Sequence, residues 1–187
     1  MSLPNLLSWL LAITITTTQY AFAQSSDETI KEAPLENIWV VREISKTEVI
    51  ASVSGLNTFG DKLKVRFVKG RCDEGNLLTT VFTTANHPEI LQLEDKLVSI
   101  KFMGDDAFAL VHFSIPFLGG HSSLVDLNWV PVDGLKYLLK RKNPIEVEFI
   151  GSNEFALSEY FDVRFNSWSN LGLSEALDRA SEICKTL

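Results

Sequence analysis

The stretch Lys62-Leu63-Lys64-Val65-Arg66-Phe67 alternates strictly between basic and apolar residues. Successive side chains of a strand point to opposite faces of a sheet, so Leu63, Val65 and Phe67 share one face and the basic residues share the other. This pattern is typical of an antiparallel strand with one buried face and one face in water. We therefore expect an antiparallel sheet and assign the rest of the chain around this strand.

Similar short alternating runs recur along the chain, separated by Gly, Asn, Asp and Pro residues that favour turns. The run from Phe108 to Phe117 is the most apolar of them. We expect it to form a central strand covered on both sides, with Val111 and Phe113 on the same face. The predicted strands comprise residues 47–53, 62–67, 77–84, 97–103, 108–117, 145–150 and 161–165.

Two segments show the 3.6-residue periodicity of amphipathic helices. The first is expected to begin after Asp133 as its N-cap and to end at Lys140. The second is expected to begin after Ser174 and to carry an apolar stripe that includes Cys184. Together these elements predict an α+β fold, in which a mainly antiparallel sheet of about seven to nine strands is joined by a mid-chain helix and a C-terminal helix packed on the sheet.

The first 23 residues contain no charged side chain, and their apolar run from Leu6 to Ile15 is too short to span a bilayer. Ala21-Phe22-Ala23 then matches the small-x-small pattern of a cleavage site. We expect a signal-peptide helix that is cleaved after Ala23, which leaves no stable membrane anchor. An apolar anchor that stays attached is the alternative, because no Lys or Arg precedes the apolar run. The predicted organisation is a signal peptide at 1–23, a flexible leader at 24–36 and a single α+β domain at 37–187.

The chain carries 24 acidic residues and 17 Lys or Arg residues, which gives a net charge of −7. Electrostatic binding of nucleic acid or of anionic lipid depends on concentrated positive charge, so the acidic balance argues against both partners. A hydrophobic content of 45%, with 12 Phe, predicts a packed core rather than disorder.

The chain has two cysteines, Cys72 and Cys184, so a single intramolecular disulfide can form. Exported proteins enter compartments where thiols oxidise, and we therefore predict that Cys72 and Cys184 are bridged. Cys184 lies on the apolar stripe of the last predicted helix, and Cys72 follows the strand that contains Leu63. The bridge would join the terminal helix to the sheet; two buried free thiols are the alternative.

Three features together resemble a group of exported bacterial proteins, the type VI secretion-associated VasI group. They are Trp39-Val40-Val41 at the start of the domain, the strand Leu63-Lys64-Val65-Arg66-Phe67 that leads to Cys72, and the terminal amphipathic helix that ends near Cys184. The resemblance covers roughly residues 37–187. It implies a non-enzymatic accessory or binding protein of the bacterial cell envelope, and it supplies no catalytic residues.

The histidines His87, His112 and His121 share no metal-type spacing, so no metal site is predicted. His112 falls in an apolar strand, which favours a hydrogen-bonded core histidine over one that titrates near neutral pH. His121 lies in the Gly-rich stretch Gly119–Ser123, which we interpret as a strand connector rather than a catalytic loop. The chain also lacks a P-loop, a Rossmann fingerprint and a G-x-S-x-G elbow, so no cofactor and no catalytic residue are predicted.

Two tryptophans are the remaining candidates for a binding role. Trp129 and Trp168 fall near the ends of predicted elements, and Trp168 is expected on the outward phase of its strand. A partly exposed Trp can anchor a partner, whereas the alternative is a cover over the edge of the sheet.

The leading hypothesis is therefore an exported, periplasmic or secreted, non-enzymatic accessory protein that binds a protein or another envelope component. One alternative is an immunity or inhibitor protein that masks an exported toxin with its acidic surface. Another is a small secreted hydrolase that uses His112 or His121.

Overall fold

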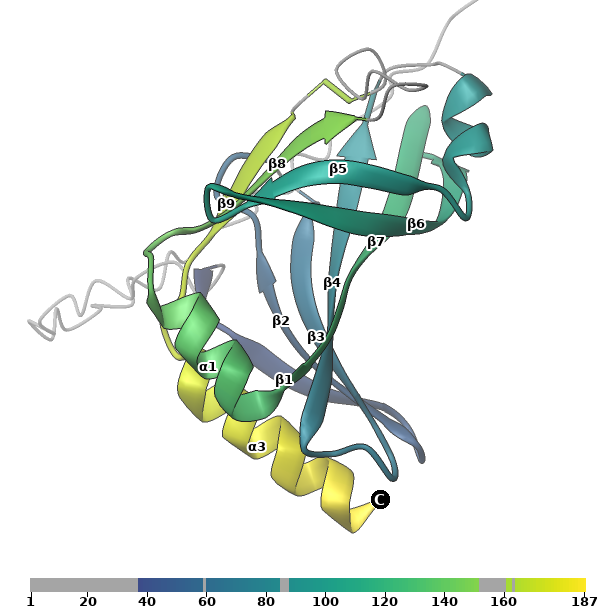
Figure 1. Cartoon of the computed structure of the whole chain (residues 1–187). Coiled ribbons are helices and arrows are strands. Elements are labelled where there is room, and N and C mark those ends of the chain that lie inside the picture. Colours follow the sequence, from purple (N-terminus) through teal and green to yellow (C-terminus); the bar gives the residue numbers. More distant parts are fainter. Residues whose placement is uncertain (1–36, 59, 85–87, 152–160, 163) are drawn as a thin grey trace, which may run out of the picture. The chain divides into compact units, whose positions relative to one another are not determined.

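The strand predicted from Lys62 to Phe67 is present as β3 (Lys62–Val68), and it lies inside an antiparallel sheet (Figure 1). The computed structural model describes residues 37–58, 60–84, 88–151, 161–162 and 164–187, all within one compact unit. The predicted signal peptide (1–23), the predicted leader (24–36) and His87 lie outside the described residues.

Nine strands of the described chain form one sheet in the order β1-β2-β3-β4-β7-β6-β5-β8-β9. Every neighbouring pair is antiparallel. The other strands are β1 (Val40–Ser45), β2 (Glu48–Ser54), β4 (Glu74–Thr83), β5 (Leu97–Phe102), β6 (Asp105–Phe117), β7 (Gly120–Pro131), β8 (Ile145–Gly151) and β9 (Phe165–Trp168). The prediction of a mainly antiparallel α+β fold is confirmed.

The two predicted helices are present as α1 (Val132–Lys140) and α3 (Leu173–Thr186), and a 3₁₀ helix, η2 (Pro88–Leu93), follows β4. Neither Asp133 nor Ser174 is an N-cap, because both residues lie in the first turn. The N-cap positions belong to Pro131, where β7 runs directly into α1, and to Gly172 with φ 74°. Gly172 turns the chain sharply into α3 through a left-handed conformation that side chains disfavour.

The sequence pattern does not predict β7, and it indicates a connector at Gly119–Ser123, a stretch that the structure places largely in this strand. The turn that joins β6 to β7 contains Leu118 and Gly119, while Gly120 to Ser123 already belong to β7. Buried positions of β7 are occupied by His121 and Ser123, so the strand lacks an apolar alternation. Because polar residues occupy buried positions of β7, the apolar-polar alternation that predicts a strand is missing from its sequence.

A bulge in β6 overturns the expected arrangement of its side chains. β6 lies inside the sheet, as a central strand should, but its register with β7 shifts between Val111 and Phe113, which leaves His112 as an extra residue. One extra residue moves all following side chains to the opposite face. Val111 is accordingly buried, whereas Phe113 and Ile115 are exposed. The predictions that Val111 and Phe113 share a face and that the strand is covered on both sides are wrong.

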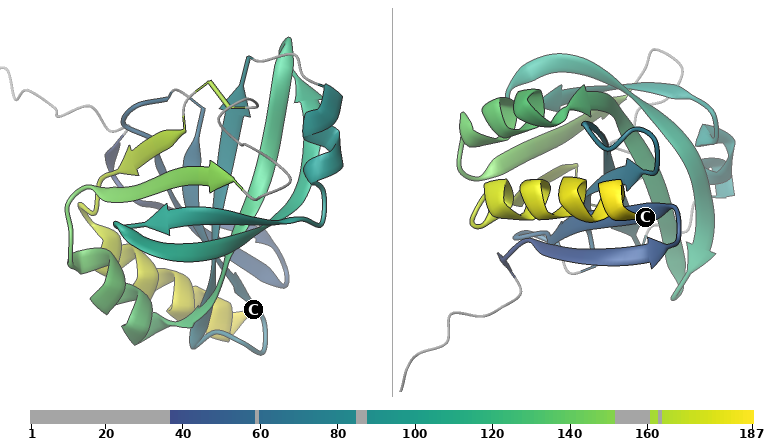
Figure 2. Two further views of the ribbon diagram at one scale, coloured as in Figure 1. Left: turned by 45° about the horizontal axis from the view of Figure 1, so that its top comes forward. Right: turned by 90° about the horizontal axis from the view of Figure 1, so that it is seen from below.

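The sheet curls until its last strand reaches the end of β2 (Figure 2). Trp168 of β9 forms an antiparallel bridge with Gly55, and the Leu56 N–H donates to the Ser167 carbonyl at 2.8 Å. Nearby, the indole N–H of Trp39 donates to the Ser169 carbonyl at 2.8 Å. These contacts join the end of the sheet to its beginning.

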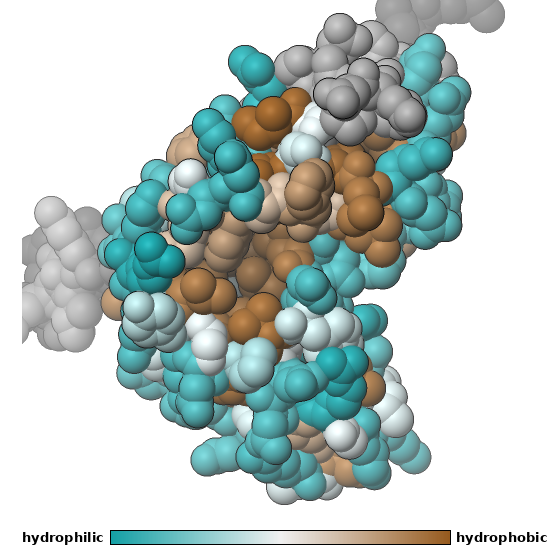
Figure 3. All heavy atoms as spheres, in the orientation of Figure 1, coloured by the Kyte–Doolittle hydropathy of each residue, from teal (hydrophilic) through white to brown (hydrophobic). Residues whose placement is uncertain are grey.

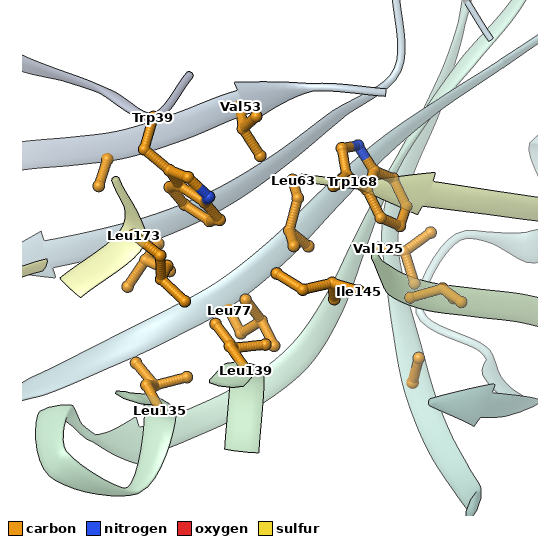
Figure 4. Packing of buried hydrophobic residues seen from close by; sticks show 14 of the residues in the cluster. Trp39, Val53, Leu63, Leu77, Val125, Leu135, Leu139, Ile145, Trp168 and Leu173 are labelled. Atoms are coloured by element: carbon orange, nitrogen blue, oxygen red, sulfur yellow. The ribbon is translucent and has the colours of Figure 1, made fainter. Parts of the chain in front are cut away.

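The concave face of the curled sheet holds the hydrophobic core, and α3 packs on the first strands of this face (Figures 1 and 4). Leu63, Val65 and Phe67 are all fully buried there, which confirms the face assigned to them from the sequence. Across the same core lie Leu135 and Leu139 of α1. Among the described residues, α1 and α3 therefore cover the inner face of the sheet and not its outer face.

The predicted disulfide is present between Cys72 and Cys184, with a Cα–Cα distance of 5.5 Å. Cys72 lies in the turn between β3 and β4, and Cys184 lies in the last turn of α3. Beside the bridge, the Ser181 hydroxyl donates to the Cys72 carbonyl at 2.8 Å. The disulfide thus holds the terminal helix against the sheet.

Loss of this disulfide should lower stability substantially. The bridge closes a loop with a sequence separation of 112, for which chain-entropy estimates give about 4–5 kcal/mol as an upper figure. We expect Cys72→Ala/Cys184→Ala to lower the free energy of unfolding in urea, and dithiothreitol to destabilise the wild-type protein but not the variant. Mass spectrometry should show both thiols blocked in the wild-type protein; free thiols would contradict the bridge.

Asp61 is a fully buried carboxylate near the join of the sheet. Its Oδ1 accepts a hydrogen bond from the Phe82 N–H and its Oδ2 one from the Asn166 amide, both at 2.7 Å. These bonds favour the charged form, but the loss of solvent outweighs them, and burial raises the pKa of Asp61 from 3.8 to about 6.

This raised pKa predicts an unusual dependence of stability on pH. Between about pH 4 and pH 6 the folded state keeps a proton that the unfolded state has lost, so the stability contributed by Asp61 falls as the pH rises. The full shift corresponds to roughly 3 kcal/mol at most. Urea unfolding of wild-type and Asp61→Asn proteins should show the wild type losing stability relative to the variant from about pH 4 to about pH 7. Parallel pH profiles of the two proteins would contradict the assignment.

Candidate functional site

The outer face of the sheet carries a group of exposed hydrophobic side chains along β6. Phe108 is 72% exposed and Leu118, in the turn after β6, is 84% exposed. We call this group the apolar patch, and it consists of Leu97, Phe108, Phe113, Ile115, Phe117 and Leu118. Figure 3 shows hydrophobic side chains gathered over β6 in the view drawn. Contiguous exposed apolar surface of this kind is typical of an interaction site.

The bulge at His112 creates the second half of the apolar patch, because it turns Phe113, Ile115 and Phe117 to the outside. The neighbouring strands continue the apolar surface: Leu124 of β7 pairs with Phe113, and Leu110 pairs with Leu97. Apolar residues of β5 and β7 therefore flank the row along β6 on both sides.

The patch ends in a small pocket beside the turn between β6 and β7. The Phe82 and Phe117 rings meet edge to face at a centroid distance of 6.3 Å and form one wall. The pocket has a volume of about 390 Å³ and is lined by Gly60, Phe82, Phe117, Leu118 and Ser122. Such a mainly apolar hollow can receive one hydrophobic side chain of a partner.

A network of polar contacts centred on Asp126 lies next to the apolar patch on the same face. Asp126 Oδ1 accepts hydrogen bonds from the Asn76 amide at 2.8 Å and the Asn128 N–H at 2.7 Å. Asp126 Oδ2 lies 2.9 Å from His112 Nε2. The carboxylate therefore holds the bulged histidine in a fixed orientation.

The network continues to the other side of β4 through Arg66. Its guanidinium donates to Asn76 Oδ1 at 3.1 Å and lies 3.8 Å from Glu48 of β2. Polar contacts thus cross five neighbouring strands, from β2 to β6, on the outer face. These contacts connect the strands where the register of β7 is irregular on both sides.

Trp129 is half-buried, and two arginines make cation–π contacts with its ring. The Arg71 guanidinium lies 3.9 Å from the ring centroid and the Arg66 guanidinium lies 5.8 Å from it. Arg71 is itself held by an ion pair with Glu74. A face of the Trp129 ring is therefore already occupied within the fold, which matches a cover over the sheet better than an anchor for a partner.

Trp168 does not lie where the sequence pattern placed it. The side chain is 0% exposed and points into the core among Leu63, Val125 and Ile145 (Figure 4). The last strand begins at Phe165, and the three residues after Phe165 are all buried. The prediction of an outward Trp168 is wrong because β9 closes the sheet and alternation no longer separates a wet face from a dry one.

The two histidine candidates do not form one site. His112 is hydrogen-bonded as predicted, but its side chain is 38% exposed on the outer face, so the prediction of a core position is wrong. His121 is buried on the inward phase of β7. Within the described residues, the hydrogen bond of His112 is to Asp126, and the nearby Ser114 hydroxyl pairs with Ser123 at 2.7 Å on the buried side.

No match was found when the chain was compared with protein-family models, with curated proteins and with solved structures. Expectations that rested on the resemblance to the VasI group therefore stay predictions. Among the described residues, no group of three His, Cys, Asp or Glu side chains is placed to hold a metal ion. The helices in that same part of the chain are too short or too polar to span a bilayer.

The Asp126 network predicts unequal effects of two neighbouring substitutions. Asp126→Ala leaves the buried Asn76 amide and the Asn128 N–H without their acceptor, so the free energy of unfolding should fall by about 2–3 kcal/mol. His112→Ala removes a half-exposed partner only and should cost less than about 1 kcal/mol. Urea unfolding measures both; equal costs would show that the carboxylate does not organise this region.

Proposed function

We propose that this chain is an exported, non-enzymatic binding protein that recognises a protein partner through the apolar patch. The observation that carries the proposal is the row of exposed aromatic and aliphatic side chains from Phe108 to Leu118. The row extends along roughly 30 Å of strand, which is the scale of a protein interface rather than of a small-molecule site.

The chemistry of the patch favours a protein as the partner. Its members are uncharged, and three of them are phenylalanines, a residue type enriched in the cores of protein interfaces. The pocket between Phe82 and Phe117 offers a place for one anchoring side chain. The partner should therefore present an apolar surface that fits the row of side chains along β6, with one side chain that enters the pocket.

Two observations support an exported location. The Cys72–Cys184 disulfide is the kind of bond that persists in oxidising compartments. The uncharged apolar segment that ends at Ala21-Phe22-Ala23 has the pattern of a signal peptide. The assignment to the bacterial cell envelope, with a secretion-system association, rests on the resemblance to the VasI group.

The geometry gives less support to the other two hypotheses. A hydrolase based on His112 needs a nucleophile within reach, and the Ser114 and Ser123 hydroxyls bond to each other on the opposite face. An inhibitor that acts through acidic surface charge predicts binding that weakens strongly with salt. Binding through the apolar patch predicts affinity that changes little with salt.

The decisive experiment compares substitutions on two exposed faces. Phe108→Lys and Ile115→Lys place a charge in the apolar patch, and Tyr137→Lys places the same charge on α1, where Tyr137 is 71% exposed. Each tagged protein is expressed in its native cells, crosslinked and purified from the envelope fraction. We expect a specific partner to be captured by the wild-type protein and by Tyr137→Lys, and capture to fall at least about tenfold in the patch variants.

The controls separate loss of binding from loss of fold. Near-ultraviolet circular dichroism and thermal unfolding should be unchanged in all three variants, because the substituted side chains are solvent-exposed. Capture that is equal in patch and control variants would overturn the apolar patch as the interface. Binding to the same partner that disappears at high salt would support the inhibitor hypothesis instead.

A further inference from the structure

A second pocket lies on the outer face of the sheet, over β1, β2 and β3, away from the apolar patch. It has a volume of about 190 Å³. Two cations, Arg42 and Lys62, and two hydroxyls, those of Ser52 and Ser54, line it. We call it the basic pocket, and its apolar wall is formed by Ile38 and Val40.

Strand register explains why these side chains meet. Ser52 of β2 pairs with Lys64 of β3, and Ser54 pairs with Lys62, so each serine lies opposite a lysine on the same face. Arg42 of β1 pairs with Ile50, one step along the same face from Ser52. Cross-strand and diagonal neighbours in a sheet lie within reach of one another's side chains.

The positive charges of the basic pocket are not neutralised by the surrounding fold. Within the described residues, neither Arg42, Lys62 nor Lys64 has a carboxylate within ion-pair distance. The acid on this face of β2, Glu48, faces Arg66 instead. Clustered like charges are destabilising, and this cluster occurs in a chain whose net charge is −7.

Lys64, which pairs with Ser52, lies next to the basic pocket. It is half-buried, and burial together with the neighbouring Lys62 lowers the pKa of the Lys64 ammonium. An anion placed beside the two lysines would remove this repulsion. The Ser52 and Ser54 hydroxyls are also without a hydrogen-bond partner in the part of the chain that the structure describes, so they are free to donate.

We propose that the basic pocket binds a phosphate group. The Arg42 guanidinium, the Lys62 ammonium and two hydroxyls provide the donors that phosphate oxygens require, and two positive charges in the lining suit a dianion better than a single carboxylate. The small volume limits the bound part to the phosphate group and its nearest atoms. The site is independent of the apolar patch, because its residues lie on β1 to β3 rather than on β5 to β7.

The first test titrates the purified protein with inorganic phosphate and with pyrophosphate, at constant ionic strength and with chloride as the comparison anion. Isothermal calorimetry should show saturable binding of phosphate. Arg42→Gln/Lys62→Gln should weaken it at least tenfold, whereas Lys140→Gln, a charge loss at the end of α1, should change it less than twofold. Circular dichroism confirms that each variant is folded.

An independent readout comes from Lys64 itself. The ¹³Cε resonance of Lys64 titrates with its ammonium, so NMR can follow its pKa with and without phosphate. Binding should raise that pKa back towards the ordinary value for lysine, since a neighbouring anion favours the charged form. A pKa that does not move while phosphate is saturating would place the bound anion elsewhere and overturn the assignment.

Vesicles separate a free phosphate from one carried by a lipid. If the phosphate belongs to a lipid headgroup, the wild-type protein should float with phosphatidylcholine vesicles that contain phosphatidic acid. The Arg42→Gln/Lys62→Gln variant should then not float with them. Binding of inorganic phosphate or pyrophosphate without flotation assigns the site to a soluble phosphate compound. Absence of saturable binding in both arms, or equal binding by the double variant, would overturn the proposal.

Discussion

The concave face of the curled sheet is apolar, and the need to bury this face determines where the helices and the disulfide lie. α3 covers the first strands with a stripe of small and aliphatic residues that includes Ala176, Leu177 and Ala180. The disulfide between Cys72 and Cys184 holds this helix on the sheet. Because α1 and α3 lie on the concave side, neither of these helices covers the outer face in the described part of the chain. Each feature to which we assign a binding role lies on that outer face.

The outer face is divided by the polar contacts around Asp126. The apolar patch lies towards β5 and β6, and the basic pocket lies on β1 to β3. The contacts from Glu48 through Arg66 to His112 cross the face from β2 to β6, and they pass over β4, the strand between the two regions, at Asn76. Two ligands of opposite chemistry, an apolar protein surface and a phosphate group, can therefore be bound without competing for the same residues.

The bulge at His112 determines which side chains form the apolar patch along β6. Without the bulge at His112, simple alternation places Phe113, Ile115 and Phe117 beside Val111 on the buried face, and the apolar row along β6 would not exist. A bulge depends on the pairing of a strand with its neighbour, so the sequence of β6 taken alone cannot reveal it. The network around Asp126 gives the physical reason for its position, since the extra residue is the histidine that the carboxylate holds.

Local pattern and residue counts were enough to predict the antiparallel sheet, the two helices, the buried face of β3 and, because there are only two cysteines, the pairing of the disulfide. The features that depend on strand pairing could be seen in the folded protein alone. Closure of the sheet buried Trp168, and pairing of β1, β2 and β3 gathered Arg42 with Lys62 into a positive cluster that the net charge of −7 had concealed. The physical reason is that alternation fixes which side of a strand a residue faces, whereas register, bulges and closure fix what lies beside it and whether that side meets solvent.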